Sequence, residues 1–178
     1  MKLRLQLENK DYLAYHLYNS SKSSLHKKKR MRGRVFIPIL FLILGSLFIL
    51  TSKNLNAFLI YVAIAVCWFL LHPFYSRWLY KNHFRKHIKE TYKNRVHKTA
   101  ELTFKDDSVF IEEPTSETRI YTTEFQELIE LPDYYFLKLK SDVSIIFPKS
   151  TIANRTAFKR YFQNHQIRCT DELNWRWS

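Results

Sequence analysis

Glycine is scarce in this sequence, because the 178 residues include only Gly33 and Gly45. Loops that bind phosphate through backbone N–H groups need several closely spaced glycines, so no known loop of that type can form. Cysteine is equally scarce: the two cysteines, Cys67 and Cys169, are far apart in the sequence. There is also no His-Glu-x-x-His, no cysteine pair at metal-ligand spacing and no Gly-x-Ser-x-Gly motif. We therefore expect no catalytic residues, no cofactor and no metal site.

Acidic residues are absent from residues 35–71, which hold two apolar runs separated by a polar break at 52–56. The first run, 35–50, contains thirteen Val, Ile, Leu or Phe residues. At roughly −0.3 to −0.6 kcal/mol each, they favour membrane insertion by about 4–8 kcal/mol. The second run begins at Ala57 and continues to Tyr75, close to the length that a tilted spanning helix needs. The sequence thus predicts a two-helix transmembrane hairpin over residues 35–75.

A soluble helical hairpin buried in protein is the alternative. A helix that packs on a core from one side keeps a polar stripe, and residues 36–44 offer none. The chain is also too short to enclose two wholly apolar helices in protein and still form the strand-rich region that follows. The composition therefore favours the membrane.

The basic residues are concentrated in the membrane half of the chain. Residues 1–97 hold 18 Lys or Arg and three acidic residues, whereas residues 98–178 hold 11 basic and 13 acidic residues. A groove-reading nucleic-acid module would display its basic residues on the folded domain, which is mildly acidic here. We therefore expect no nucleic-acid partner, in spite of the net charge of +13.

The basic residues flank the hairpin, while its connecting loop carries only Lys53. The positive-inside rule then predicts a multi-pass protein of the cell membrane with two spans and both termini in the cytoplasm. We expect the flanking residues to attract anionic lipid headgroups at about 1 kcal/mol each. They are Lys27, Lys28, Lys29, Arg30, Arg32, Arg34, Arg77, Lys81, Arg85 and Lys86, continued after the second span by Lys89, Lys93 and Arg95.

Two further sets of residues suit a membrane protein. Trp68, Trp78 and Tyr80 lie where aromatic rings at the membrane interface are expected. Gly45 and Ser46 are small residues within the first span, which would allow another span to approach closely.

Strand-like segments and turn-forming residues follow one another from about residue 99 onward. A helix then follows to about Gln163, with Thr151 or Asn154 as its N-cap. The alternating segment Lys2–Leu7 predicts a further strand, and because so short a strand needs a sheet to join, we hypothesise that it pairs with this one. The six strands expected in the C-terminal half are Ala100–Lys105, Val109–Glu113, Thr118–Thr123, Phe125–Leu131, Tyr134–Lys140 and Val143–Phe147.

The predicted fold is an α+β membrane protein with a transmembrane hairpin and a cytoplasmic antiparallel β-roll capped by a C-terminal helix. Its four predicted segments are 1–34 with a strand, a short helix and a basic stretch, 35–75 with the hairpin, 76–97 with a basic juxtamembrane helix, and 98–178 with the β domain and tail.

This plan resembles that of pleckstrin-homology-like (PH-like) domains. Residues 125–137, with the sequence FQELIELPDYYFL, and residues 145–149, IIFPK, resemble the C-terminal domain of the YcxB-like family of bacterial membrane proteins. The N-terminal strand, the helix start at residues 11–13 and the central hairpin are similar to that family too. The resemblance implies the architecture and leaves the function open, because the family has no established activity to carry over.

Three functions remain compatible with this architecture. The first, which we favour, is a membrane-anchored interaction module that binds a protein or lipid partner. The second is a subunit of a membrane complex, a homo-oligomer included, or a self-protection (immunity-like) factor, acting through the hairpin. The third is an unrecognised membrane enzyme.

The C-terminal tail contains Trp175 and Trp177, two of the four tryptophans. Aromatic rings in a tail are costly to leave exposed, so they should pack either on the β domain or at the membrane interface beside the basic helix. We expect them to pack on the β domain.

Overall fold

The computed structural model describes residues 1–93, 96 and 98–177. Among these residues the chain is α+β, with two long apolar helices and two four-stranded sheets. The helices are α1 (Asn9–Lys22), α2 (Ser24–Ser52), α3 (Leu55–Thr91) and α4 (Arg155–Asn164). The strands are β1 (Lys2–Gln6), β2 (Thr99–Phe104), β3 (Ser108–Glu113), β4 (Ser116–Tyr121), β5 (Phe125–Glu130), β6 (Tyr134–Leu139), β7 (Ser144–Pro148) and β8 (Arg168–Asp171).

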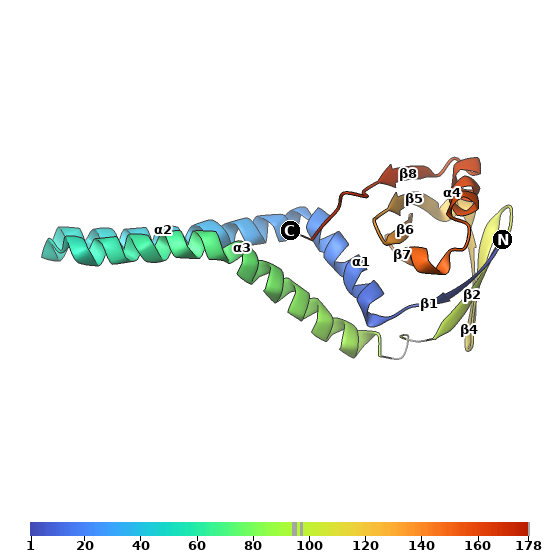
Figure 1. Ribbon diagram of the computed structural model, residues 1–178, viewed down its shortest axis with the longest axis horizontal. Coiled ribbons are helices and arrows are strands. Elements are labelled where there is room, and N and C mark those ends of the chain that lie inside the picture. Colours follow the sequence, from blue (N-terminus) through green and yellow to red (C-terminus); the bar gives the residue numbers. More distant parts are fainter. Residues whose placement is uncertain (94–95, 97, 178) are drawn as a thin grey trace. The chain divides into compact units, whose positions relative to one another are not determined.

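The chain divides into two compact units, which are described separately. The first unit, here called the β domain, consists of residues 1–15 and 85–176, and the second, the helical unit, consists of 16–84 with the C-terminal Trp177. Figure 1 labels the elements of both units other than β3. The prediction that the second helix extends to residue 97 was too long, because α3 ends at Thr91 and Tyr92 and Lys93 are no longer helical. The basic residue Arg95 falls outside the described residues.

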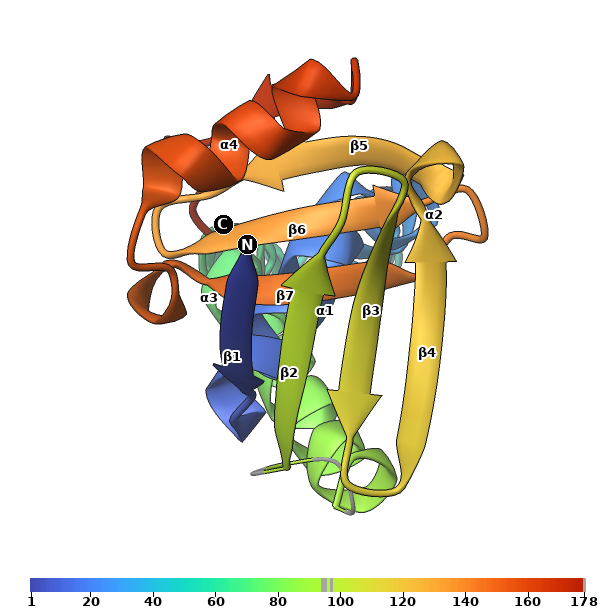
Figure 2. The same cartoon turned by 90° about the vertical axis from the view of Figure 1, so that its right-hand side faces the viewer.

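The β domain is built from two sheets. The first has the order β1-β2-β3-β4 and is antiparallel throughout, and the second has the order β7-β6-β5-β8. Figure 2 shows that the strands of the first sheet run across β5, β6 and β7. The six strands predicted in the C-terminal half are all present, with bounds that differ by at most two residues.

The prediction of a purely antiparallel roll was wrong at one position. β8 was not predicted, and it pairs with β5 in parallel, from Glu127 opposite Arg168 to Glu130 opposite Asp171. A parallel pair needs a crossover connection, which α4 provides here. The four residues of β8 lack the apolar alternation by which a strand can be predicted, because their side chains are largely exposed.

The prediction that the N-terminal segment joins the sheet is confirmed. β1 pairs antiparallel with β2, with Lys2 opposite Thr103 and Gln6 opposite Thr99. Leu3 and Leu5 are 7% and 5% exposed and belong to the core of the domain. The alternation in β1 therefore reflects one buried and one exposed face.

The helix α4 closes one side of the β domain. Its N-cap is Asn154, whose side chain accepts a hydrogen bond from the backbone N–H of Ala157 at 2.9 Å. Phe158 and Phe162 are fully buried. The ring of Phe158 lies 5.1 Å from that of Phe147, between centroids, in an edge-to-face contact typical of packed aromatic cores.

The helical unit contains α2 and most of α3. The serine-rich stretch around Ser20–Ser24 is largely helical, and the side chain of Ser23 accepts a hydrogen bond from the backbone N–H of His26 as the N-cap of α2. The basic cluster that precedes the first apolar run is therefore part of one continuous helix. Lys53 ends α2 in the left-handed conformation, with φ at 50°.

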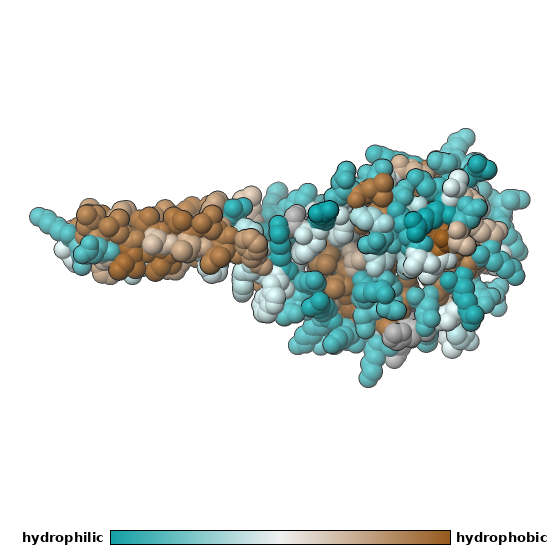
Figure 3. Space-filling view, in the orientation of Figure 1, coloured by the Kyte–Doolittle hydropathy of each residue, from teal (hydrophilic) through white to brown (hydrophobic). Residues whose placement is uncertain are grey.

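Both long helices meet the length and composition requirements for crossing a membrane. Only 11% of the most apolar window of α2 and 6% of that of α3 are buried. The surface of the hairpin part of the two helices is accordingly apolar, as Figure 3 shows. A hairpin enclosed in a protein core would instead have its Leu, Ile and Phe side chains covered.

Candidate functional sites

The small residues of the first span lie in different environments. Gly45 is buried, and a Cβ atom at this position would lie 2.9 Å from the Cβ of Tyr61 and 3.3 Å from Cδ2 of Phe58. Only glycine permits this approach of α2 to α3. Ser46 is exposed, and its hydroxyl donates to the Leu42 carbonyl of the same helix at 2.8 Å. Gly45 thus serves the packing of the hairpin itself, while Ser46 lies outside that contact.

Three of the ten basic residues named as interface candidates lie close to an aromatic ring, and two of them, Arg30 and Arg34, are also partly buried. The guanidinium carbon of the third, the exposed Arg77, lies 5.8 Å from the ring centroid of Phe74. The guanidinium carbon of Arg34 lies 4.1 Å from the ring centroid of Phe69, and its Nε donates to the Phe69 carbonyl. That of Arg30 lies 5.7 Å from the ring of Tyr80 and 5.1 Å from that of Trp177. All except Arg30 and Arg34 are exposed on the two long helices: Lys27, Lys28, Lys29, Arg32, Arg77, Lys81, Arg85 and Lys86.

The three aromatic residues named as interface candidates also differ. The indole N–H of Trp68 donates to the Gly33 carbonyl at 3.2 Å, which links α3 to α2. The hydroxyl of Tyr80 lies 3.4 Å from Nδ1 of His26. Trp78 is 59% exposed, so it is the one of the three that most fully presents its ring to the surroundings.

The tail tryptophan Trp177 contradicts the expectation that it packs on the β domain. Its ring belongs to the helical unit, 6.3 Å from the ring of Tyr80 between centroids and within cation–π distance of Arg30. The reason is chemical: the Arg30 guanidinium lies over the rings of both Tyr80 and Trp177, and each ring face attracts a cation.

A charged network in the β domain is centred on Glu130, whose side chain is 15% exposed. Its carboxylate accepts from the ammonium groups of Lys149 at 2.9 Å and Lys159 at 2.6 Å, and from the hydroxyl of Tyr135 at 3.0 Å. Burial raises the pKa of Glu130, but these three hydrogen bonds outweigh it and lower the pKa to about 2. Glu130 is therefore ionised near neutral pH. Its hydrogen bonds and ion pairs connect β5 to α4 and to the segment after β7.

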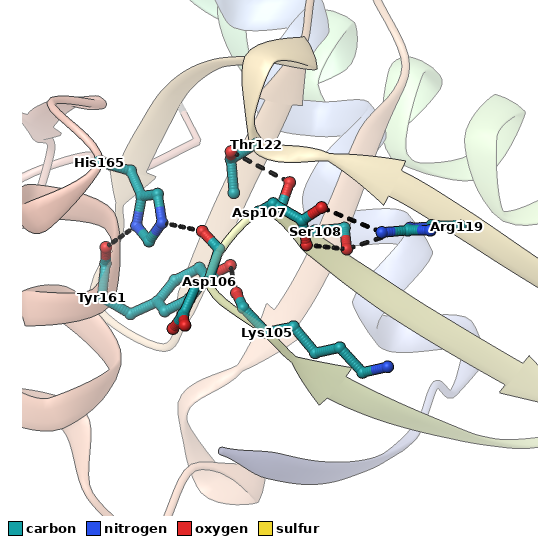
Figure 4. Close-up of polar contacts among 8 residues, drawn as sticks. All are labelled: Lys105, Asp106, Asp107, Ser108, Arg119, Thr122, Tyr161 and His165. Carbon is teal, nitrogen blue, oxygen red and sulfur yellow. Dashed lines mark hydrogen bonds and ion pairs between the residues drawn. The ribbon is translucent and has the colours of Figure 1, made fainter.

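A second polar network surrounds the turn between β2 and β3 (Figure 4). Arg119 donates to the Asp107 carboxylate at 3.0 Å and to the Ser108 hydroxyl at 3.2 Å. The His165 ring, at the end of α4, contacts the backbone carbonyls of Tyr161 and Asp106. These groups satisfy one another, so the network fixes the turn and supplies no free nucleophile or base.

A cavity of about 620 Å³ with both apolar and polar lining residues lies in the β domain; we call it the sheet cavity. Its walls include residues from both sheets, together with tyrosines from α1 and from the segment after α3. The apolar lining residues are Leu5, Leu7, Ala100, Leu102, Ile111, Ile120, Leu139, Val143, Ile145 and Ile146. Sequence reasoning did not identify this site, because its residues come from strands that are far apart in the chain.

No group of three His, Cys, Asp or Glu side chains within the described part of the chain is arranged to hold a metal ion. Comparison with family models, with curated proteins and with solved structures gave no match. The chemistry of these sites therefore rests on their geometry alone.

Proposed function

We propose that the chain is a two-span membrane protein whose β domain is a PH-like binding module at the cytoplasmic face of the cell membrane, where it binds a lipid or protein partner. The plan of strands and capping helix, together with its resemblance to the YcxB-like family, supports the PH-like assignment. The charged networks are internally satisfied, which favours binding over catalysis.

The observation that carries this proposal is the pairing of β1 with β2. The two strands flank the apolar helices in the sequence, yet they share one sheet, so both must lie on the same side of any membrane. The intervening chain therefore crosses a membrane an even number of times. Two helices with exposed apolar surfaces satisfy this requirement as a hairpin.

The distribution of charge supports the orientation. The eight exposed basic residues flank the ends of the hairpin that lead to β1 and β2, whereas the loop between α2 and α3 carries only Lys53. The positive-inside rule places such flanks in the cytoplasm, where anionic headgroups attract them.

Cysteine accessibility in intact cells tests the proposal. Single cysteines are introduced at the exposed residues Ser52 and Ser24 after Cys67 and Cys169 have been replaced by serine, and a membrane-impermeant maleimide is added outside. We expect labelling of Ser52→Cys and protection of Ser24→Cys until the cells are opened. Labelling of Ser24→Cys in intact cells would refute the orientation, and release of the chain by alkaline carbonate would refute the membrane anchor.

A further inference from the structure

The two ends of the space between the sheets of the β domain differ. At one end α4 inserts Phe158 and Phe162, which are fully buried among the rings of Phe104 and Phe147. The sheet cavity has no lining residue from α4. One end of the interior is therefore filled by side chains of the domain, and the other leaves a space with one apolar wall, bordered by polar residues such as Ser116, Thr118 and Ser144.

The exposure of the lining residues shows that this apolar surface is incompletely covered. Ala100, Ile111, Ile120 and Ile145 pack against the core from the inner faces of their strands, yet all four are only partly buried. An inward-facing Ile in the middle of a small domain is ordinarily covered by its neighbours. A ligand within the cavity would complete this burial.

The charged groups at the cavity are few. The lining includes Lys98, Glu113 and Asp142. Glu113 accepts a hydrogen bond from Ser116 at 3.4 Å, and Asp142 lies 3.4 Å from the ammonium group of Lys138. Each carboxylate thus has a partner of its own, so among the described residues that line the cavity the Lys98 ammonium is the cation available to an acidic ligand group.

Tyrosines form the part of the wall that the sheets do not provide. The rings of Tyr12 and Tyr92 stack with 4.3 Å between their centroids, and Tyr15 makes an edge-to-face contact with Phe136. These rings offer apolar faces to a ligand and polar hydroxyls at their ends. The cavity thus combines a long apolar wall with a polar boundary, as ligand sites of about 300–1,000 Å³ commonly do.

We propose that the sheet cavity binds one unbranched acyl chain, with the acidic group that such a lipid carries located near Lys98. A flexible chain without polar groups fits a wall of Leu, Ile and Ala side chains, and a carboxylate or phosphate complements the ammonium group. The inference deepens the proposed function and rests on it, because a chain with two spans in a bilayer is surrounded by lipid. Free fatty acids and phospholipids both offer this chemistry.

Photolabelling of the full chain in lipid nanodiscs tests the inference. One sample receives a fatty acid with a diazirine near the end of its chain, and a second receives phosphatidylglycerol with the same diazirine-bearing chain. Labelled peptides are then identified by mass spectrometry. We expect label on β3, β4 and β7, in addition to the label on α2 and α3 that any lipid contact produces. The sample that labels the strands identifies the source of the acyl chain.

Variants locate the bound chain. Ala100→Phe and Ile120→Trp each fill the cavity from a different strand and should reduce label on the remaining cavity peptides at least tenfold, with unchanged label on α2 and α3. Glu101→Phe adds the same ring at the exposed neighbouring position and should leave the label unchanged. Lys98→Ala removes the ammonium group and should reduce labelling of the strands at least threefold, with whichever of the two acidic probes labels them. Protection of β5 amides from hydrogen exchange verifies that each variant is folded.

The outcomes separate the two proposals. Label on α2 and α3 without label on the strands would overturn the acyl-chain inference and leave the membrane anchor intact. Label on the strands without label on the helices would support the inference and refute the anchor. Strand label that persists in both folded filling variants would show that the chain binds outside the sheet cavity and would overturn the inference.

Discussion

Replacing Glu130 by glutamine tests the charged network of the β domain. The substitution keeps the shape of the side chain but removes the charge that pairs with Lys149 and Lys159, whose ammonium groups lie 2.9 and 2.6 Å from the carboxylate. The Lys149 side chain is only 8% exposed, so its charge would be left without a counter-ion in a largely buried place. Glu130→Gln should therefore destabilise the domain markedly.

The magnitude follows from the pKa. Lowering the pKa of Glu130 from 4.5 to about 2 corresponds to about 3 kcal/mol, at about 1.4 kcal/mol per pH unit. Because the folded state binds its proton more weakly than the unfolded state, this contribution is fully present above pH 4.5. It is lost as the pH falls from 4.5 toward about 2. The deficit of Glu130→Gln should then be about 3 kcal/mol at pH 7 and should shrink progressively below pH 4.5.

Urea titration of the full chain with pulsed hydrogen exchange measures this deficit on peptides of β5 and β6, separately from the helices. Asp142→Asn is the matched control, since it breaks an ion pair whose carboxylate is 86% exposed and should cost less than about 0.5 kcal/mol. A deficit for Glu130→Gln equal to that of the control, or one that stays constant from pH 7 to pH 3, would refute the reasoning.

Two other substitutions test the packing of each unit. Gly45→Leu places a Cβ 2.9 Å from the Cβ of Tyr61 and should destabilise the hairpin by about 1–3 kcal/mol, measured as the separation of α2 from α3 with increasing concentration of a denaturing detergent. Ser46→Leu, at an exposed position, should leave the stability of the hairpin unchanged. Equal effects of the two substitutions would contradict the assigned contact. Leu5→Ala should lower the unfolding free energy of the β domain by about 2–5 kcal/mol in the urea assay, because Leu5 is buried in the core. Arg4→Ala, at the exposed neighbouring position, should be nearly neutral. An unchanged unfolding free energy for Leu5→Ala would show that β1 does not contribute to the core.

Local sequence patterns predicted where the strands of this protein lie better than which strands pair with one another. The strands from β2 to β7 could be predicted because each combines apolar or β-branched residues with turn formers at its ends. β1 was predictable for the same reason, and its need for a sheet followed from its shortness. β8 was not predicted, because it is held by backbone pairing with β5 and by hydrogen bonds such as that of Thr170 with Glu127, and these leave no periodic trace in the sequence.

The candidate sites were predicted only in part. The charge and apolar runs indicated the basic and apolar residues of α2 and α3, but not that Arg30 lies against Trp177 from the other end of the chain. The expected packing on the β domain was wrong for Trp177, because sequence alone does not reveal which arginine is within reach of its ring, whereas Trp175 belongs to the β domain. The Glu130 network and the sheet cavity depend on pairing between distant strands, so no local pattern could indicate them.

The pairing of β1 with β2 also determines the order in which the chain can be completed during synthesis. β1 leaves the ribosome first, but its partner follows about a hundred residues later, after both apolar helices. Until then the segment has no sheet to join, and when β2 emerges, its edge is open to pairing with another chain. Closure of so long a loop is slow in free solution. A bilayer that already holds the helices as a hairpin would keep the two ends in one compartment, so prompt insertion would protect the nascent sheet from aggregation.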